Sequence, residues 1–389
     1  MGMEAGEVVK VSSSLADNQD LVIEILSQLP IKSLVRFMCV SQEWSALIKS
    51  SRFIAIHQKC LQRLNPPNLC LLYGHSSGSR FAKYPKHHGI SLLGKDTHLE
   101  GLDLPERVQQ DSYDRLILIA GSSNGLVCLY PLNTPKEIIV VWNPATRQHR
   151  YLPKPLSFKG RKETSDAPLL GFGFINDNGK YNTDFKVVRI SHSKDRDADG
   201  RFTYLTQVFT RSEKSWREVK NCIPPGDYNF EPGSSISSNG VVYCLARTKG
   251  VPFVFSFNLH DEVIHNMPMP PRYSLFYGQR LFTWENSVAF LTHVERKYDL
   301  WVMEKESGTQ MPTWNWTAQF TIKNLPQFMD LIFVFWDGLF LFVKRQVRAG
   351  QDLVTYDRAT TGAMKAFKLA TGNSCLQVVD YVQSLVSVF

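Results

Sequence analysis

Histidine and cysteine are the side chains of this chain best suited to metal binding or nucleophilic catalysis, and neither type is spaced for it. The ten histidines include the neighbours His87 and His88 and the pair His260 and His265, but none forms an HExxH or His/Cys metal pattern. The seven cysteines are scattered, and no two form a CxxC pair. The sequence therefore predicts no metal site and no catalytic residue of these types.

Glycine-rich segments could bind phosphate, and the best candidate here lacks the required context. Gly171-Phe172-Gly173 does not continue into GxGxxG, and no helical pattern follows to supply backbone N–H groups. A GxSxG nucleophile elbow and a Walker motif are also missing from the sequence. We therefore expect no cofactor and no reaction catalysed by this chain itself.

The surroundings of the cysteines indicate the compartment. Cys39, Cys128 and Cys244 each lie within an apolar run, which is typical of reduced core thiols. The first residues lack the apolar segment of a signal peptide, and no stretch reaches the roughly 18 apolar residues of a membrane helix. We expect the cytoplasm or the nucleus, with no membrane partner.

Charge is distributed unevenly along the chain. The formal net charge is +8, and all of the excess lies after residue 60, because the first 60 residues hold equal numbers of basic and acidic side chains. A basic body favours an acidic or phosphorylated protein partner. Its Lys and Arg residues are dispersed, with only short clusters such as Lys154–Lys162, which disfavours nucleic acid.

Apolar spacing predicts short helices over residues 20–57. Val22, Ile25, Leu26 and Leu29 recur at i, i+3, i+4 and i+7, and Pro30 ends this first helix. A second helix is expected over about 32–40 and a third from residue 42, followed by a further turn from residue 53. A unit of about forty residues buries little apolar surface of its own. The apolar face that remains exposed must be covered either by a partner protein or by the rest of the chain. The apolar pattern does not favour one of these two interpretations over the other.

From residue 69 onward the sequence changes to strand-like runs separated by turn residues. Gly-led apolar strands recur about 45 to 70 residues apart, long enough for a four-stranded unit each. Their starts are Asn124, Gly171, Asn239, Glu285 and Asp337. We predict an α plus all-β protein whose body is a β-propeller of about six blades, closed by residues 380–389 pairing with the first unit. A two-sheet sandwich is the alternative.

The helical segment carries an ordered set of short motifs. They are Asp20-Leu21, Glu24-Ile25-Leu26, Leu29-Pro30, Lys32-Ser33-Leu34, Arg36-Phe37, Cys39-Val40-Ser41, Trp44, Leu47-Ile48, Phe53 and His57. This set resembles the F-box of the large plant family that also carries an F-box-associated, kelch-like (type 1) interaction domain. One departure is that Asp17-Asn18 stands where the family pattern has Leu-Pro, which predicts weaker adaptor binding.

The body resembles the F-box-associated domain of the same family across nearly all of 68–388. The matching motifs are Gly121–Leu126, Trp142–Thr146, Leu170–Phe174, Phe185–Arg189, Ser215–Arg217, Trp301–Met303 and Tyr381-Val382. The resemblance implies a disordered tail over 1–16, an F-box of three helices over 17–60 and a propeller-like recognition domain over 61–389.

The same resemblance implies a function. It is that of the substrate-recognition subunit of a Skp–cullin–F-box (SCF) ubiquitin ligase, which binds a Skp-type adaptor and selects a protein for ubiquitination and proteasomal degradation. The adaptor-binding residues implied are Leu21, Ile25, Leu26, Leu29, Pro30, Leu34, Val40 and Trp44. A propeller enzyme, or an RNA-binding propeller with the helices packed on its own body, is the alternative.

Overall fold

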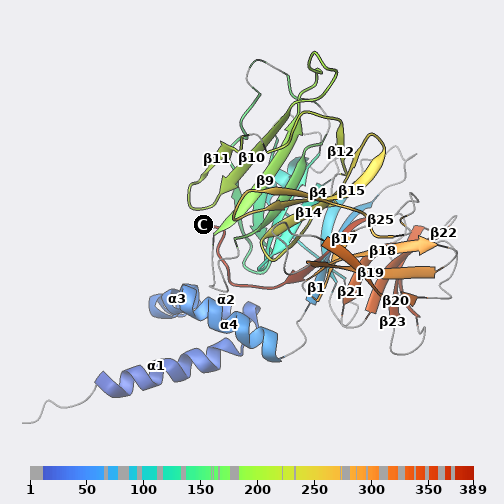
Figure 1. Cartoon of the computed structure of the whole chain (residues 1–389). Helices are drawn as coiled ribbons and strands as arrows, with labels where there is room; N and C mark the ends of the chain where they lie inside the picture. The colour runs from blue at the N-terminus through green and yellow to red at the C-terminus, as the bar shows by residue number, and fades with distance from the viewer. Residues whose placement is uncertain are drawn as a thin grey trace, which may run out of the picture.

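The chain forms a small group of helices and a ring of β-sheets (Figure 1). The computed structural model describes residues 12–64, 69–77, 87–93, 99–111, 117–132, 137–158, 160, 162–164, 167–175, 184–220, 222–231, 234–271, 273, 281–285, 287–294, 297–305, 314–322, 329–336, 339–346, 350–357, 364–368 and 373–389. No helix in these ranges is long and apolar enough to cross a membrane.

Four helices make up the helical head: α1 (Ser12–Ser27), α2 (Ile31–Phe37), α3 (Gln42–Lys49) and α4 (Ser51–Leu64). Pro30 separates α1 from α2 in an extended conformation, as its fixed φ predicts. Ser41 caps α3, because its hydroxyl accepts a hydrogen bond of 3.1 Å from the backbone N–H of Trp44.

The head differs from the predicted three helices in two places. Its first helix begins at Ser12, within the segment 1–16 that was expected to be a disordered tail. A fourth helix, α4, replaces the single turn expected near residue 53 and runs past the expected domain boundary at 60. The body then begins with a strand at Leu69.

The buried residues of the head form the helical part of a core that continues into the propeller. His57 lies under Phe53 with the two rings stacked 6.1 Å apart, and its Nε2 donates a hydrogen bond of 3.0 Å to the carbonyl oxygen of Leu29. The remaining members of this core are apolar. They are Ile23, Leu26, Ile31, Leu34, Ile48 and Ile54, none more than 6% exposed.

Six sheets form the body, and the strands within each sheet pair antiparallel. Blade 1 consists of β1 (Leu69–Ser77), β2 (His87–Leu93), β3 (Leu99–Gly101) and β25 (Asn373–Val382), and helix α5 (Glu106–Asp111) leads to blade 2. Blade 2 consists of β4 (Ile117–Ser123), β5 (Leu126–Pro131), β6 (Val140–Asn143) and β7 (Gln148–Tyr151). Blade 3 consists of β8 (Leu169–Phe174), β9 (Phe185–His192), β10 (Tyr204–Thr210) and β11 (Ser215–Glu218).

The other three blades repeat this antiparallel arrangement. Blade 4 consists of β12 (Tyr228–Phe230), β13 (Ile236–Ser238), β14 (Val241–Thr248), β15 (Val251–Asn258) and β16 (Ile264–Met267). Blade 5 consists of β17 (Leu281–Trp284), β18 (Ser287–Val294), β19 (Lys297–Lys305) and β20 (Trp314–Ile322). Blade 6 consists of β21 (Met329–Trp336), β22 (Leu339–Gln346), β23 (Gly350–Asp357) and β24 (Met364–Lys368). The six-bladed propeller is confirmed, and the sandwich alternative is wrong.

Local turn chemistry explains several hairpins. Asn124-Gly125 joins β4 to β5 with φ values of +48° and +76°, and Asn239-Gly240 joins β13 to β14 with +50° and +77°. Two consecutive positive φ values define the two-residue turn that matches the twist of paired strands. Asn and Gly accept this backbone at low cost.

The ring closes in blade 1, where strands from distant parts of the chain pair. β25 pairs antiparallel with β1, and Cys70 faces Tyr381 in the register. Only residues 380–382 of the predicted closing segment 380–389 lie in this strand. Residues 383–389 continue as an irregular tail beyond the sheet.

Buried ion pairs connect neighbouring blades. Lys186 of blade 3 donates to Glu262 of blade 4 at 2.7 Å, and both side chains are at most 14% exposed. Arg189, only 1% exposed, pairs with Glu137 at 2.8 Å and with Glu163 at 2.5 Å. Because the carboxylates compensate the buried cations, these pairs are tolerated inside the body.

Candidate functional site

The apolar residues of the head divide into a buried and an exposed set. Leu21, Ile25 and Val40 are 57%, 55% and 66% exposed. Pro30 is also exposed, while Leu29 and Trp44 are half-buried against the head core. These six of the predicted adaptor-binding residues are therefore available to a partner at least in part.

Leu26 and Leu34 have a different role from the predicted one. They are 3% and 0% exposed and lie in the core of the head, so a partner cannot touch their side chains while the helices stay packed. The buried face of α1 runs through Ile23 and Leu26, whereas the apolar spacing had indicated a stripe including Ile25. Sequence reasoning missed Ile23 because the helix carries apolar residues on more than one face.

Trp44 is held in place by its neighbours. The ring of Phe37 meets it edge-on with centroids 5.4 Å apart, a favourable arrangement for two aromatic rings. Because Ser41 also fixes the start of α3, the indole is presented from a rigid position. Positions 17 and 18, where the family has Leu-Pro, lie inside α1.

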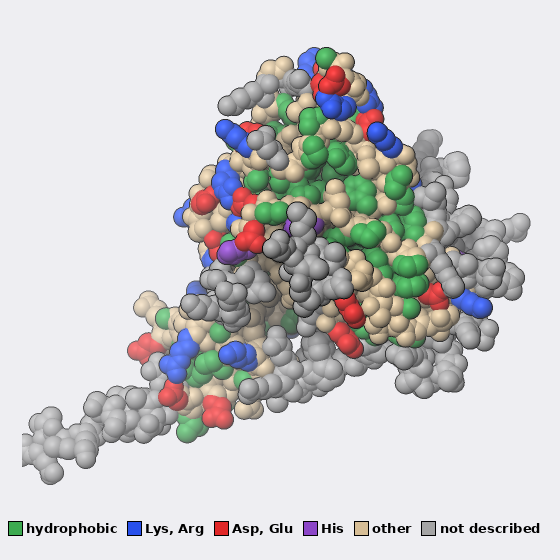
Figure 2. Space-filling view, viewed as in Figure 1, with side chains coloured by type: hydrophobic (Ala, Val, Ile, Leu, Met, Phe, Trp, Pro, Cys, Tyr) green, Lys and Arg blue, Asp and Glu red, His purple; other side chains and the backbone are tan. Residues whose placement is uncertain are grey.

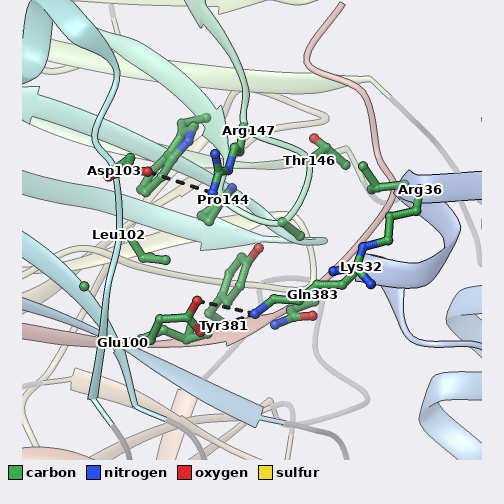
Figure 3. A pocket seen from close by; sticks show the side chains of 15 residues that line it. Lys32, Arg36, Glu100, Leu102, Asp103, Pro144, Thr146, Arg147, Tyr381 and Gln383 are labelled. Carbon is green, nitrogen blue, oxygen red and sulfur yellow. Dashed lines mark hydrogen bonds and ion pairs between the residues drawn. The ribbon is translucent and has the colours of Figure 1, made fainter. Parts of the chain in front are cut away.

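The opposite side of the head meets the propeller. Lys32 of α2 forms an ion pair of 3.3 Å with Glu100 of β3, and both side chains are more than half exposed. Beside this pair lies a junction cavity of about 430 Å³. Figure 3 shows Lys32 and Arg36 entering it from the head, opposite Tyr381 and Arg147 of the body. Part of the head thus packs on its own body, and part stays open to a partner.

The irregular tail lies along blade 2 and belongs to the same apolar cluster as the head core. Asn143 Nδ2 donates to the carbonyl oxygens of Ser384 at 3.0 Å and Val386 at 2.8 Å. The hydroxyl of Ser384 donates to the carbonyl oxygen of Asn124 at 2.6 Å. A Cβ at Gly125 would come within 2.3 Å of Ser384, so only glycine fits this turn. Head, tail and blade 2 are therefore joined through one cluster.

A second concave site, the far-face cleft, lies between blades 3 and 4 and measures about 600 Å³. It is lined by the start of β8, the end of β9 and the turn after β14, together with the aromatic side chains His192, Phe202, Tyr204, Tyr228 and Phe230. The tail instead touches the turns that follow β4 and β6. In antiparallel blades these two sets of strand ends lie on opposite faces. The turn after β6 also borders the junction cavity with the head, so the cleft is on the face away from the head. Figure 2 shows acidic and basic side chains gathered at the end of the body farthest from the head.

The rings of the far-face cleft are fixed by contacts with one another. Tyr204 Oη donates to the carbonyl oxygen of Tyr228 at 3.1 Å and accepts from its N–H at 2.8 Å. Burial raises the pKa of Tyr204 to about 12, so the phenol remains a donor at neutral pH. The rings of Tyr204 and Tyr228 meet edge-on at 5.4 Å. Sequence reasoning missed this site because its residues come from separate segments.

Comparison with known families agrees with both parts of this architecture. The family model for the F-box domain matches residues 18–56. The model described as F-box associated beta propeller domain matches residues 90–370, which is most of the chain.

The chain belongs to the F-box proteins that carry this propeller.

Its relatives include plant F-box proteins. One F-box protein of Arabidopsis thaliana is 30% identical over 257 residues, covering 64% of this chain and 58% of the relative. Another from the same plant is 27% identical over 319 residues, covering 79% of this chain and 74% of the relative. The chain thus spans somewhat more than half of the first relative's length. The resemblance seen in the motifs is confirmed at the level of family.

Solved structures with a related outline are distant. TolB from Acinetobacter baumannii has a TM-score of 0.45 and 12% identity, covering 84% of this chain and 71% of that chain. The Cps50 (Swd1) β-propeller domain has a TM-score of 0.36 and 8% identity, covering 78% of this chain and 90% of that chain. Similarity at this level says nothing about ligands.

Proposed function

We propose that this F-box protein is the substrate-recognition subunit of an SCF-type ubiquitin ligase. The helical head binds a Skp-type adaptor, and through it a cullin-RING ligase, while the propeller binds the protein to be ubiquitinated and degraded. The subunit supplies no acid, base or nucleophile. It raises the effective concentration of a target lysine near the charged conjugating enzyme.

The exposed apolar side chains of the head support this proposal most directly. Leu21 and Ile25 lie one helical turn apart on α1, so they share one face, and each is more than half exposed. Val40, in the turn between α2 and α3, is also largely exposed. Large apolar groups left in solvent on a folded unit mark a surface that another protein covers. The family match to the F-box is consistent with an adaptor as that protein.

Co-purification with a Skp-type adaptor tests the proposal. The double variant Leu21→Asp with Ile25→Asp places two charges on the exposed face without touching the head core. We expect capture of the adaptor to fall at least tenfold, because buried interface carboxylates without partners are costly.

The matched control makes the same kind of change elsewhere on the head. Lys49→Asp with Lys59→Asp alters two exposed positions on α3 and α4, and adaptor capture should remain near the wild-type level. Equal capture by wild type and the Leu21/Ile25 variant, with both folded, would remove the basis of the proposal.

We place this activity in the cytoplasm or the nucleus, because five cysteines in the described ranges are unpaired. Alkylation of the protein directly after lysis of plant cells, followed by mass spectrometry, checks it. If all cysteine thiols react with the alkylating reagent after denaturation, the result supports a reducing compartment. Intramolecular disulfides would contradict the proposed cytoplasmic or nuclear location.

A further inference from the structure

The far-face cleft has the form of a ligand site and takes no part in adaptor binding as proposed above. Its volume of about 600 Å³ lies within the usual range of ligand pockets. The floor is mainly apolar, formed by aromatic rings together with Pro168, Leu169 and Ile190. Because the ring contacts and the Tyr204 hydrogen bonds fix this floor, a ligand would not need to order it on binding.

The cleft extends along three strand ends rather than forming a closed hole. Asn229 lies exposed in β12 on its lining, and the turn after β14 forms another part of it. Aromatic-lined surface grooves of this kind bind extended peptide segments, with apolar side chains resting on the rings. Its shape therefore favours an extended chain over a compact small molecule.

The charges around the rim favour an acidic ligand. Arg196 lies over the ring of Phe202 at 4.1 Å and pairs with Asp227 at 2.8 Å. A cationic group of a ligand therefore cannot occupy that face of the Phe202 ring. Arg247 pairs with Glu231 at 3.4 Å while 40% of its side chain stays exposed. Within the described residues, no carboxylate lies at ion-pair distance from Lys249. Among the described cations of the rim, Lys249 is thus the one without a carboxylate at ion-pair distance.

We propose that the far-face cleft binds an extended segment of the target protein in which an apolar or aromatic anchor residue adjoins an Asp or Glu. The anchor packs on the aromatic floor, and the carboxylate pairs with Lys249 and Arg247. This inference rests on the proposed function, since it names the class of substrate that the propeller recognises. It also agrees with the net positive charge of the body.

The same rim argues against the other ligand classes. A basic segment would bring its charges beside Lys249, whose charge no described carboxylate offsets, and this is unfavourable. Single-stranded RNA stacks bases on aromatic rings but needs a continuous cationic track for its phosphates. The carboxylates of Asp227 and Glu231 interrupt that track.

Selection from a displayed library of random twelve-residue peptides tests the inference, using the purified full chain. We expect selected peptides to share an apolar or aromatic residue next to Asp or Glu. Binding of a fluorescein-labelled selected peptide should weaken about tenfold in Lys249→Glu, because an attractive charge contact becomes repulsive. Phe202→Ala, which removes one ring of the floor, should weaken it by a similar or larger factor.

Lys214→Glu is the matched control for the charge reversal. Lys214 and Lys249 are both exposed lysines in hairpin turns with positive φ, +56° and +49°, but Lys214 lies in the turn after β10, away from the cleft. Its variant should bind the peptide as wild type does. Melting temperatures should stay unchanged in the two lysine variants, and adaptor capture should stay unchanged in all three, which separates this test from that of the proposed function.

Three results would overturn the inference. One is enrichment of Lys- or Arg-rich peptides, and another is a selected peptide that binds Lys249→Glu and Phe202→Ala as tightly as wild type. The third is competition of oligo(U) RNA for the cleft with a steep dependence on salt, which would assign the site to nucleic acid.

Discussion

The helical head and the propeller bury their apolar residues in different ways. All six residues of β5 and all six of β8 are buried, because each blade is covered by its neighbours on both faces. The head keeps a core but leaves Leu21, Ile25 and Val40 in solvent. Single apolar residues such as Val251 are also exposed on the body, but on the head two of them, Leu21 and Ile25, share one helical face. We propose that a partner protein covers the apolar residues that are exposed on the head.

The largest expected effect comes from the propeller core. Phe172→Ala removes a fully buried ring that packs 5.6 Å from the ring of Phe185. We expect the free energy of unfolding to fall by about 3–5 kcal/mol. Denaturant unfolding followed by tryptophan fluorescence measures it.

An exposed apolar residue of the same body provides the control. Val251→Ala changes a side chain that is 63% exposed on β15, so stability should change by less than about 0.5 kcal/mol. Similar losses in both variants would show that the blades are not packed as described.

Leu34 in the core of the head gives the next largest effect, which should be greatest within the head. Leu34→Ala removes a side chain with 0% exposure and should cost about 2–5 kcal/mol. Hydrogen exchange should rise more across α1–α4 than in the blades, because Leu34 lies in the helical part of the cluster that head, tail and blade 2 share.

Ile25→Ala separates folding from binding within the same head. Ile25 is 55% exposed, so its loss should leave hydrogen exchange near wild type while adaptor capture falls. If exchange instead rises equally throughout the head and the blades after Leu34→Ala, the two regions form a single cooperative unit and the comparison fails.

A smaller effect is expected on acidification. Lowering the pH should destabilise the head at a higher pH than the propeller. Burial lowers the pKa of His57 below 6.5, against the raising effect of its bond to Leu29. The neutral ring therefore stabilises the head fully above pH 6.5, and this contribution is lost as pH falls through the folded-state pKa. Hydrogen exchange of α1–α4 between pH 7.5 and 5 measures it, and His57→Gln should flatten the dependence.

The blade contact at Glu262 should persist to lower pH. Burial would raise the pKa of Glu262, but hydrogen bonds from Arg217 and Lys186 outweigh it and hold the pKa below 4.5. This stabilisation is present above the ordinary carboxyl pKa and is lost only as pH falls through the lowered value. Loss of blade protection already between pH 7 and 6 would contradict this order.

The smallest effect is expected at the contact between the two regions. Lys32 and Glu100 are both more than half exposed, and such pairs contribute only about 0–1 kcal/mol. Lys32→Ala should therefore shift the melting temperature little. A large shift would mean that the head depends on the body for its stability.

The blades were predictable because their turns are encoded locally. Asn124-Gly125 and Asn239-Gly240 demand the positive φ values that the hairpins show, and apolar strands follow each pair. The predicted start at Gly171 lies inside β8 rather than in a turn, so this local signal accounts for only part of the predicted blade number.

The remaining features depend on packing that local sequence does not specify. Helix α4 was missed although Phe53, Ile54 and His57 fit helical spacing, because the predicted pattern ended after one turn. The choice between Ile23 and Ile25 as the buried residue depends on how α1 lies on its neighbours. The far-face cleft unites residues separated by up to 86 positions, Thr164 to Gly250, and no single motif marks it.

Closure of blade 1 has a consequence for synthesis of the protein. β1 cannot pair with β25 until β25, which begins at Asn373, has been synthesised. A ribosome adding about 5–20 residues per second needs on the order of 15–60 s to make the chain between them. Throughout that interval the head has already left the ribosome, while the first sheet still has an unpaired edge. Prompt adaptor binding would shield the apolar helices during this delay, and the open edge of β1 would be the point most vulnerable to misassociation.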